Sequence, residues 1–149
     1  MIIKFNNKEV AVRLVPSTYF MNEASVIKNT TGAQEICSSL ASNFDREVVG
    51  VLNLKNNLEL INYSLVSMGD AKSSIFEPCE ILKVAILSNA TSIIVFHNHP
   101  SGDVTPSRAD AKATERLKKA CDIMGIPLLD HIIVASNNES YSFADNDIL

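Results

Sequence analysis

Apolar residues are spaced in two ways along this chain, and each spacing predicts a different element. Short apolar runs bounded by turn residues are typical of strands, and apolar residues at every third or fourth position indicate helices. Strands are expected at 47–54, 58–66, 92–96, 128–135 and 141–143, and helices at 31–43, from 73 or 74 to 89, and at 105–124. This order predicts an α/β fold in which helices flank a mixed β-sheet.

The N-terminal part of the chain has its own pattern. Residues 2–5 and 10–15 read as two short strands, and residues 19–28 remain ambiguous. We therefore predict a strand-rich extension over 1–30, packed on a domain that spans 31–149. An added edge strand and a docking site for a partner both remain open for the extension.

Local signals predict where the helices begin and end. Thr31 starts a capping-box pattern, and Ser73 or Ser74 is the expected cap of the second helix. Gly125 suits the left-handed position after the third helix, and Pro127 prevents its continuation. The residues expected to face the core are Ile36, Leu40 and Phe44, then Ile81, Val84, Ala85 and Leu87, then Ala113, Leu117, Ala120, Cys121 and Met124.

The first two strands should form a hairpin. Asn56 and Asn57 lie between them, and asparagine tolerates the positive φ that tight turns require. The 47–54 strand is apolar on both faces and is therefore expected in the centre of the sheet. Residues 67–70 are expected to form a loop after the second strand.

Composition narrows the classes of protein. The chain has 149 residues, of which 46% are hydrophobic, and this suits one domain with a substantial core. The net charge of −4 argues against direct nucleic-acid binding, which needs a basic surface. No apolar run approaches the ~20 residues of a membrane span, and Met1 is not followed by a secretory signal. A cytoplasmic location is expected.

The three cysteines, Cys37, Cys79 and Cys121, are far apart in the sequence and form no Cys-x-x-Cys pair. Neither a disulfide framework nor a zinc knuckle is indicated. We expect all three to be reduced and to face the core.

Two histidines at period two provide the strongest chemical signal. His97 and His99 should leave the same side of an extended segment, and Pro100 keeps His99 extended. A lone histidine is usually a surface or core residue, but a pair at this spacing before a turn is consistent with metal ligands. A carboxylate brought beside them would complete the three protein ligands of an open, catalytic zinc site.

Asp110 is the candidate carboxylate. Ser107 and Asp110 are three residues apart at an expected helix start, so they lie on one face. The same pair fits a capping box, and an acid in the first turn also suits the helix dipole. From the residues alone, a cap and a metal ligand both remain open for Asp110.

At this point the sequence resembles a known family. The string from His97 to Asp110, with His97-x-His99, seven residues, Ser107, two residues and Asp110, is similar to the JAMM motif of the JAB/MPN metalloprotease superfamily. The surrounding His97-Asn98-His99-Pro100-Ser101-Gly102-Asp103 resembles the RadC branch, from which Val104 departs because proline is common there. The resemblance runs from about residue 45 to 144. It implies the MPN fold, an α-β-α sandwich of the cytidine-deaminase-like type.

The resemblance also implies the chemistry. It implies Zn²⁺ held by His97, His99 and Asp110, and a catalytic glutamate at Glu47. Spacing alone does not choose between Glu47 and Asp45, which share a side of the strand. For Ser107, the resemblance favours donation to a developing oxyanion, and a cap can coexist with that role.

Asp130 and His131 also fit the RadC pattern. A group behind the metal ligands, a substrate-side group and an ordinary strand histidine all remain open for His131, so no role is assigned. The cysteines are disfavoured as a fourth metal ligand.

The expected function is a zinc-dependent metallopeptidase or isopeptidase acting on a peptide or protein, with a ubiquitin-like tail as one candidate. Two alternatives remain: a non-catalytic MPN binding module, and a DNA-repair accessory protein, as the RadC label suggests. The sequence leaves the substrate and the oligomeric state open.

Overall fold

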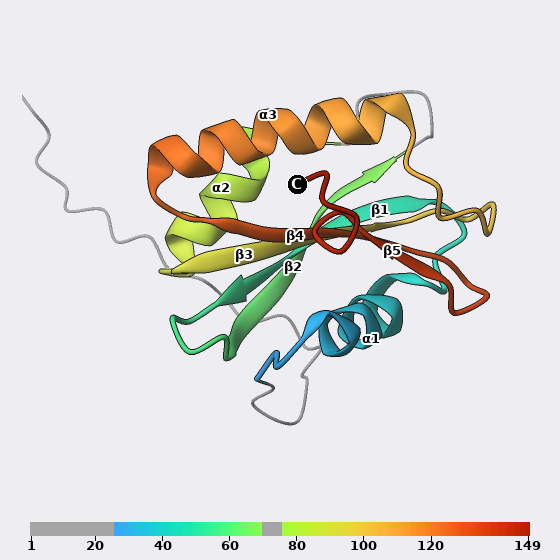
Figure 1. The fold of residues 1–149 in the computed structure, drawn as a ribbon, viewed down its shortest axis with the longest axis horizontal. Coiled ribbons are helices and arrows are strands. Elements are labelled where there is room, and N and C mark those ends of the chain that lie inside the picture. The colour runs from blue at the N-terminus through green and yellow to red at the C-terminus, as the bar shows by residue number, and fades with distance from the viewer. Residues whose placement is uncertain (1–25, 70–75) are drawn as a thin grey trace, which may run out of the picture.

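The computed structural model describes residues 26–69 and 76–149, and the strands expected at 2–5 and 10–15 lie outside these residues. Eight elements follow one another along the chain (Figure 1). They are α1 (Thr30–Ala41), β1 (Glu47–Leu54), β2 (Leu60–Gly69), α2 (Pro78–Leu87), β3 (Ser92–Asn98), α3 (Arg108–Met124), β4 (Leu128–Val134) and β5 (Ser140–Ser142).

The strands form one mixed sheet in the order β2-β1-β3-β4-β5. β1 pairs antiparallel with β2 and β3, whereas β3 and β4 are parallel. A parallel pair needs a crossover connection, and α3 supplies it. Figure 1 shows α2 and α3 on one face of the sheet and α1 on the other. The predicted α/β sandwich is therefore confirmed.

The core has two halves, one on each face of the sheet. Strand alternation sends successive side chains of β1 and β3 to opposite faces, so both strands are buried on both sides. The half between the sheet and the helices α2 and α3 contains Val49, Val51, Ile81, Ile93, Val95, Leu117 and Cys121. The half between the sheet and α1 contains Ala33, Cys37, Val48, Leu52, Ile94, Phe96 and Ile132. The predicted central position of β1 is confirmed.

The start of α1 differs from the prediction. The N-cap is Asn29, whose side chain accepts a hydrogen bond from the Gly32 amide at 2.8 Å, so the capping box expected at Thr31 is wrong. Asparagine is among the best N-cap residues, and its use begins the helix earlier. The helix also ends at Ala41, before the expected residue 43.

The β1–β2 turn also differs in its conformation. The positive φ, 63°, belongs to Leu58 and not to the asparagines. The Asn57 side chain accepts from the Glu59 amide, and this bond supports the turn without reversing the asparagine backbone. β2 then continues to Gly69, which pairs with Glu47, so the loop expected at 67–70 is wrong up to Gly69.

The start of α2 and the buried residues of α2 and α3 differ from the prediction. Ser73 and Ser74 lie outside the described residues, and α2 begins at Pro78 after Glu77, which makes no side-chain cap bond. Leu87 is 46% exposed and Met124 is 48% exposed, so neither faces the core as predicted. Leu82 is buried in place of Leu87. The predicted end of α3 is confirmed, because Gly125 has a left-handed φ of 67°.

Gly50 in β1 leaves room for the Phe96 ring of β3. It pairs with Phe96, and a Cβ added at Gly50 would lie 2.2 Å from the Phe96 ring. Phe96 is completely buried, so its ring has no free space into which it can move. A side chain at this position must therefore displace part of the core.

We predict that Gly50→Ala lowers the free energy of unfolding by about 1–3 kcal/mol through overpacking. Gly69→Ala is the matched control, because no atom of the described residues lies within 4 Å of a Cβ added there. Urea unfolding of the metal-free protein measures both. Equal stability of the two variants would contradict the close-packing argument.

Candidate metal centre

β3 places the two histidines on one face of the sheet. His97 pairs with Val49, which belongs to the core half under α2 and α3, and its side chain is fully buried. His99 follows the strand and donates its backbone N–H to the Val134 carbonyl, so the chain stays extended beside β4. The predicted common direction of His97 and His99 is confirmed.

The first turn of α3 places Asp110 beneath these rings. The Ser107 amide donates to Asp110 Oδ2 at 2.6 Å, and the Asp110 amide donates to Ser107 Oγ at 3.1 Å. This is a complete capping box, so the capping alternative is confirmed for both residues. The box also orients the carboxylate, and Asp110 Oδ1 is left facing His97. Capping and metal binding are therefore compatible uses of one side chain.

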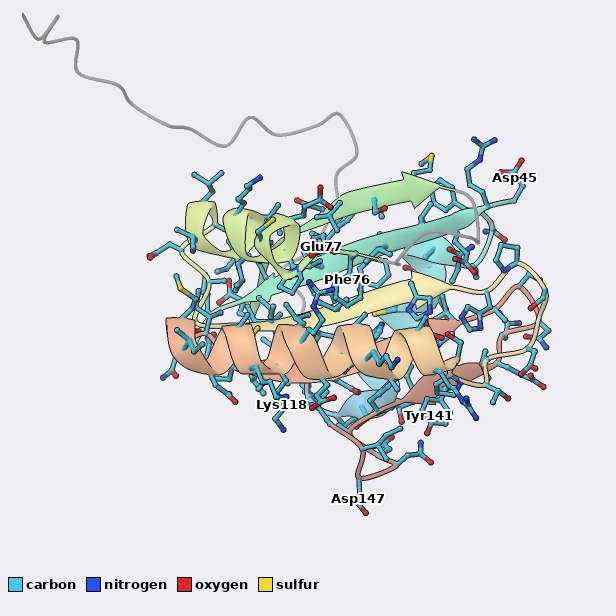
Figure 2. All side chains as sticks on the ribbon, turned by 90° about the horizontal axis from the view of Figure 1, so that it is seen from above. Asp45, Phe76, Glu77, Lys118, Tyr141 and Asp147 are labelled. Carbon is cyan, nitrogen blue, oxygen red and sulfur yellow. The ribbon has the colours of Figure 1, made fainter. Side chains whose placement is uncertain are left out.

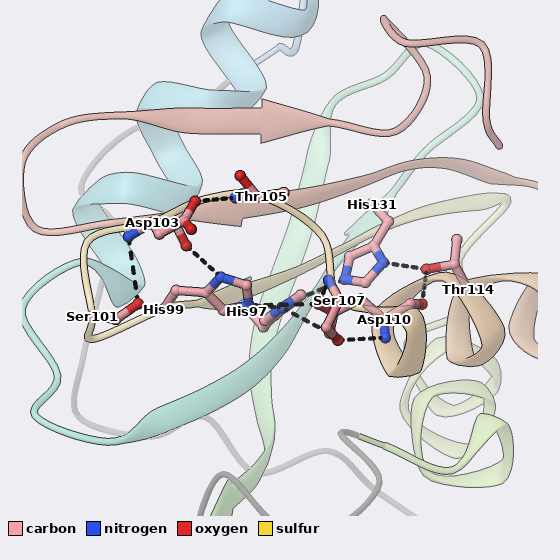
Figure 3. A network of polar contacts seen from close by, with 9 residues as sticks. All are labelled: His97, His99, Ser101, Asp103, Thr105, Ser107, Asp110, Thr114 and His131. Carbon is pink, nitrogen blue, oxygen red and sulfur yellow. Dashed lines mark hydrogen bonds and ion pairs between the residues drawn. The ribbon is translucent and has the colours of Figure 1, made fainter.

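Three potential ligand atoms converge (Figure 3). His97 Nε2 lies 3.0 Å from His99 Nε2 and 3.3 Å from Asp110 Oδ1, and His99 Nε2 lies 3.6 Å from Asp110 Oδ2. Ligand atoms around a tetrahedral zinc ion with bonds of about 2.0–2.2 Å lie roughly 3.3–3.6 Å apart. The two histidine–carboxylate separations fall in that range, and the 3.0 Å between the two Nε2 atoms is somewhat shorter. A small outward shift of one ring would therefore let the three residues hold such an ion.

The hydrogen bonds of the cluster leave acceptor atoms facing one another. His99 Nδ1 lies 2.7 Å from the Asp103 carbonyl, which can only accept, so Nδ1 carries the proton and neutral His99 presents a bare Nε2. Asp110 Oδ1 is buried and has no hydrogen-bond partner among the residues that the structure describes. Electron pairs thus meet in a buried place where a proton or a metal cation is needed between them.

The protonation equilibria show the same demand. Burial opposes ionisation of Asp110, but its contacts with His97 and His99 outweigh burial and hold its pKa well below the usual range. Contact with Asp110 raises the pKa of His99, although burial opposes the rise. In the absence of metal, contact with Asp110 therefore favours the protonated form of His99, and a metal ion would compete with that proton.

One side of the cluster is accessible to solvent. The His97 and Asp110 side chains are 0% and 1% exposed, whereas that of His99 is 14% exposed. A metal site with three protein ligands and an accessible side is typical of catalytic centres, and closed four-ligand sites are typical of structural ones.

Glu47 lies on the same face as the ligands. Val49 is opposite His97, so period-two alternation puts Glu47 on the side of His99, one step further along the same antiparallel register. The negative charge of Glu47 contributes to the raised pKa of His99. Asp45, the competing carboxylate, has an 84% exposed side chain, pairs with Arg46, and points away from the molecule (Figure 2). The geometry favours Glu47 over Asp45.

Asn98, between the two histidines, is a residue whose role the sequence did not reveal. Its Oδ1 accepts from the Val48 amide at 2.7 Å, and its Nδ2 donates to the carbonyls of Arg46 and Phe44 at 3.0 and 3.3 Å. The side chain therefore holds the backbone on both sides of Glu47. Its opposite orientation to His97 and His99, set by strand alternation, is the signal that could have suggested such a role.

His131 and Thr114 form a second group without a predicted role. His131 is completely buried, and its two ring nitrogens contact His97 Nδ1 at 2.8 Å and Thr114 Oγ1 at 2.6 Å. Burial, and then the neighbouring His97, lower the pKa of His131 well below the usual range, so the ring is neutral at pH 7. His131 thus lies behind His97, a candidate metal ligand, and this is one of the three positions that the sequence left open.

The cysteines do not take part in the cluster. Cys37 and Cys121 are buried as predicted, whereas Cys79 is exposed, so its predicted core position is wrong. Burial raises the pKa of Cys121 to about 11 and that of Cys37 well above its usual range, so both remain neutral thiols at neutral pH.

A polar groove of about 600 Å³ lies between α1 and the β4–β5 turn, away from the cluster.

Comparison with known proteins gives a consistent result. The RadC-like JAB domain family matches residues 27–148. The chain is 45% identical over 104 residues to a UPF0758 protein of Chlorobaculum tepidum, a match that covers 70% of this chain and 46% of that protein. A UPF0758 protein of Thermotoga maritima is 43% identical over 101 residues, covering 68% of this chain and 45% of the relative.

A third relative extends the match towards the N-terminus. A UPF0758 protein of Streptococcus suis is 39% identical over 137 residues, which cover 92% of this chain and 54% of that protein. The chain thus spans about half the length of these curated relatives. The predicted division at residue 30 stays a prediction. In the part of the chain that the structure describes, no helix has the length and apolar character needed to cross a bilayer.

We predict that Asn98→Ala lowers the free energy of unfolding of the metal-free protein by about 2–3 kcal/mol, because it leaves the buried Val48 amide and two carbonyls without a partner. Asn98→Asp should cost more at neutral pH, since it places carboxylate oxygens against carbonyls. Urea unfolding with a chelator present measures both. A loss below about 1 kcal/mol for both variants would show that the hydrogen bonds of the Asn98 side chain contribute little to stability.

The His99 pKa predicts a pH dependence for the metal-free protein. Because the His99 pKa is raised in the folded state, protonation of His99 stabilises the fold, and this stabilisation is complete below the unfolded pKa of 6.5. The stabilisation is lost as the pH rises through the folded-state pKa. The lowered pKa of Asp110 contributes above 3.8 and is lost at lower pH. The stability advantage of the parent over His99→Gln should therefore be larger at pH 5.5 than at pH 8.5, a difference that thermal unfolding with a chelator measures. Zinc should reverse this trend, because protons compete with the ion.

Proposed function

Because this chain belongs to the RadC-like JAB domain family, as the match over residues 27–148 shows, we propose that it is a zinc-dependent peptidase or isopeptidase. The observation that carries the proposal is the convergence of His97, His99 and Asp110 in a buried cluster that is accessible on the His99 side. Two imidazoles and one carboxylate are the ligand set of catalytic zinc in several hydrolases.

His97 Nε2, His99 Nε2 and Asp110 Oδ1 would hold the ion. Bound zinc lowers the pKa of water towards ~7 and thereby supplies hydroxide at neutral pH. Glu47, on the same face and not among the ligands, would take the proton of that water and return it to the leaving nitrogen. The raised pKa of His99 is consistent with a carboxylate at this place.

Ser107 can serve the same reaction without giving up its cap. Its oxygen accepts from the Asp110 amide, and its own hydroxyl hydrogen remains free to donate. That hydrogen would stabilise the negative charge that develops on the substrate carbonyl oxygen. Loss of such a donor typically costs ~10²–10³ in rate.

The substrate is proposed only as a class. A peptide or isopeptide bond of a protein, with a ubiquitin-like tail as one candidate, suits a hydrolytic zinc centre. We propose a cytoplasmic setting, which the free thiols Cys37, Cys79 and Cys121 support. Because the chain spans about half of its curated relatives, this assignment concerns the domain, and the activity of a whole relative is a separate question.

The alternatives are less well supported. A binding module with a vestigial site has no need to keep three converging ligand groups and a carboxylate on the same face. A direct nucleic-acid role conflicts with the net charge of −4.

We predict that the metal-free protein binds one zinc ion per chain, and that Asp110→Asn reduces the affinity by at least tenfold because it removes the charged ligand. Isothermal titration with zinc chloride measures both values. A parent protein that binds no stoichiometric zinc would overturn the proposed function. Titration with ferrous and manganous ions tests whether another metal is preferred.

We predict that Glu47→Gln keeps zinc affinity but lowers turnover by ~10²–10⁴, the usual contribution of a general base. Asp45→Asn is the matched control, because it removes an exposed carboxylate two residues away. Cleavage is read as new amino termini after incubation with a random-sequence peptide library and a set of isopeptide-linked peptides. If Asp45→Asn loses turnover and Glu47→Gln retains it, the assignment of the base is wrong.

A further inference from the structure

A chain of buried hydrogen bonds runs from the first turns of α3 to the metal-binding face of His97 (Figure 3). Thr114 Oγ1 lies 2.7 Å from the Asp110 carbonyl and 2.6 Å from His131 Nδ1. His131 Nε2 lies 2.8 Å from His97 Nδ1. The side chains of Thr114, His131 and His97 are all buried, so water does not readily supply or remove a proton along this chain.

Counting hydrogens gives one consistent direction for each bond, starting from the Asp110 carbonyl, which can only accept. The Thr114 hydroxyl has one hydrogen, and the Asp110 carbonyl can only accept, so the hydroxyl donates to the carbonyl. The 2.6 Å contact with His131 must then use a hydrogen on His131 Nδ1. Neutral His131 is left with a bare Nε2, which can only accept. His97 Nδ1 therefore carries the hydrogen of the 2.8 Å bond, and His97 Nε2 is bare.

The opposite arrangement has two costs. If the Thr114 hydroxyl donated to His131 instead, two oxygen acceptors would face each other at 2.7 Å with no hydrogen between them. His131 would then carry its hydrogen on Nε2, and His97 would have to accept at Nδ1. The hydrogen of neutral His97 would move to Nε2 and point into the place where the ion would bind. The metal-binding form of His97 is thus tied to the orientation of one hydroxyl group.

We propose that Thr114 and His131 are positioning residues that hold His97 in the tautomer whose Nε2 binds the metal ion. The inference rests on the proposed function, because it concerns the same centre. It adds that α3 acts twice: Asp110 supplies a ligand, and Thr114, one turn later, prepares another ligand through His131. The partner of a metal-bound histidine is usually a carboxylate, a carbonyl or water, and here it is a second imidazole whose own proton is set by threonine.

The test measures the zinc affinity of the full chain by competition with a fluorescent chelator. Thr114→Val keeps the shape and removes the hydroxyl, so His131 Nδ1 loses its partner and affinity should fall ~10–100-fold, as for other partners of metal-bound histidines. Thr114→Ser restores the hydroxyl and should bind within threefold of the parent. Thr91→Val is the matched control, because its hydroxyl also donates to a backbone carbonyl, that of Leu54, away from the centre.

A second measurement does not depend on any variant folding. Nitrogen-15 NMR of the imidazole rings in the parent protein distinguishes the tautomers, and we expect hydrogen on Nδ1 of both His131 and His97 in the zinc-loaded state. Hydrogen on His131 Nε2 would overturn the inference.

The outcomes separate the inference from the proposed function. If the parent binds one zinc ion and Thr114→Val binds it equally well, the positioning role is wrong and the metal centre stands. If the parent binds no zinc, the metal centre fails and the positioning role fails with it.

Discussion

A buried carboxylate oxygen without a hydrogen-bond donor is the constraint on which this site depends. Asp110 Oδ1 is buried and has no hydrogen-bond partner among the described residues, and His97 Nε2 lies 3.3 Å from it. Such an arrangement is costly unless a cation lies between the electron pairs. The fold nevertheless orients the carboxylate firmly, with a 2.6 Å bond from Ser107 to its other oxygen.

The sheet and α3 each supply part of the site. β3 carries His97 at its carboxyl end and delivers His99 just beyond it, while the parallel crossover to β4 returns the chain through α3. The crossover brings the start of α3 over the end of β3, where the capping box holds Asp110 against the rings. The hydrogen bonds that cap the start of α3 therefore also orient the Asp110 carboxylate.

The three residues from His97 to His99 contribute both to the stability of the fold and to the candidate metal site. His97 and His99 face α3, while Asn98 faces the other way and bonds to the backbone around Glu47. Three consecutive residues thus supply two candidate ligands and secure the strand that carries the proposed base. Behind them, His131 and Thr114 satisfy the remaining nitrogen of His97 with buried protein groups. Each polar atom in this part of the core has a defined partner, apart from those that face the place of the ion.

Much of this could be predicted from the sequence, because it depends on local periodicity. The bounds of β1, the common side of His97 and His99, the end of α3 at Gly125 and the family resemblance all follow from short-range patterns. The choice between cap and ligand for Asp110 could not be made, because one local pattern serves both roles. Errors arose where the position of a neighbouring element decides the outcome. β2 continues through 67–69 because it pairs with β1, and Leu87 and Met124 are exposed because no element of the described residues covers them. The roles of Asn98, Thr114 and His131 needed the tertiary structure, since each is defined by a partner between 17 and 54 residues away.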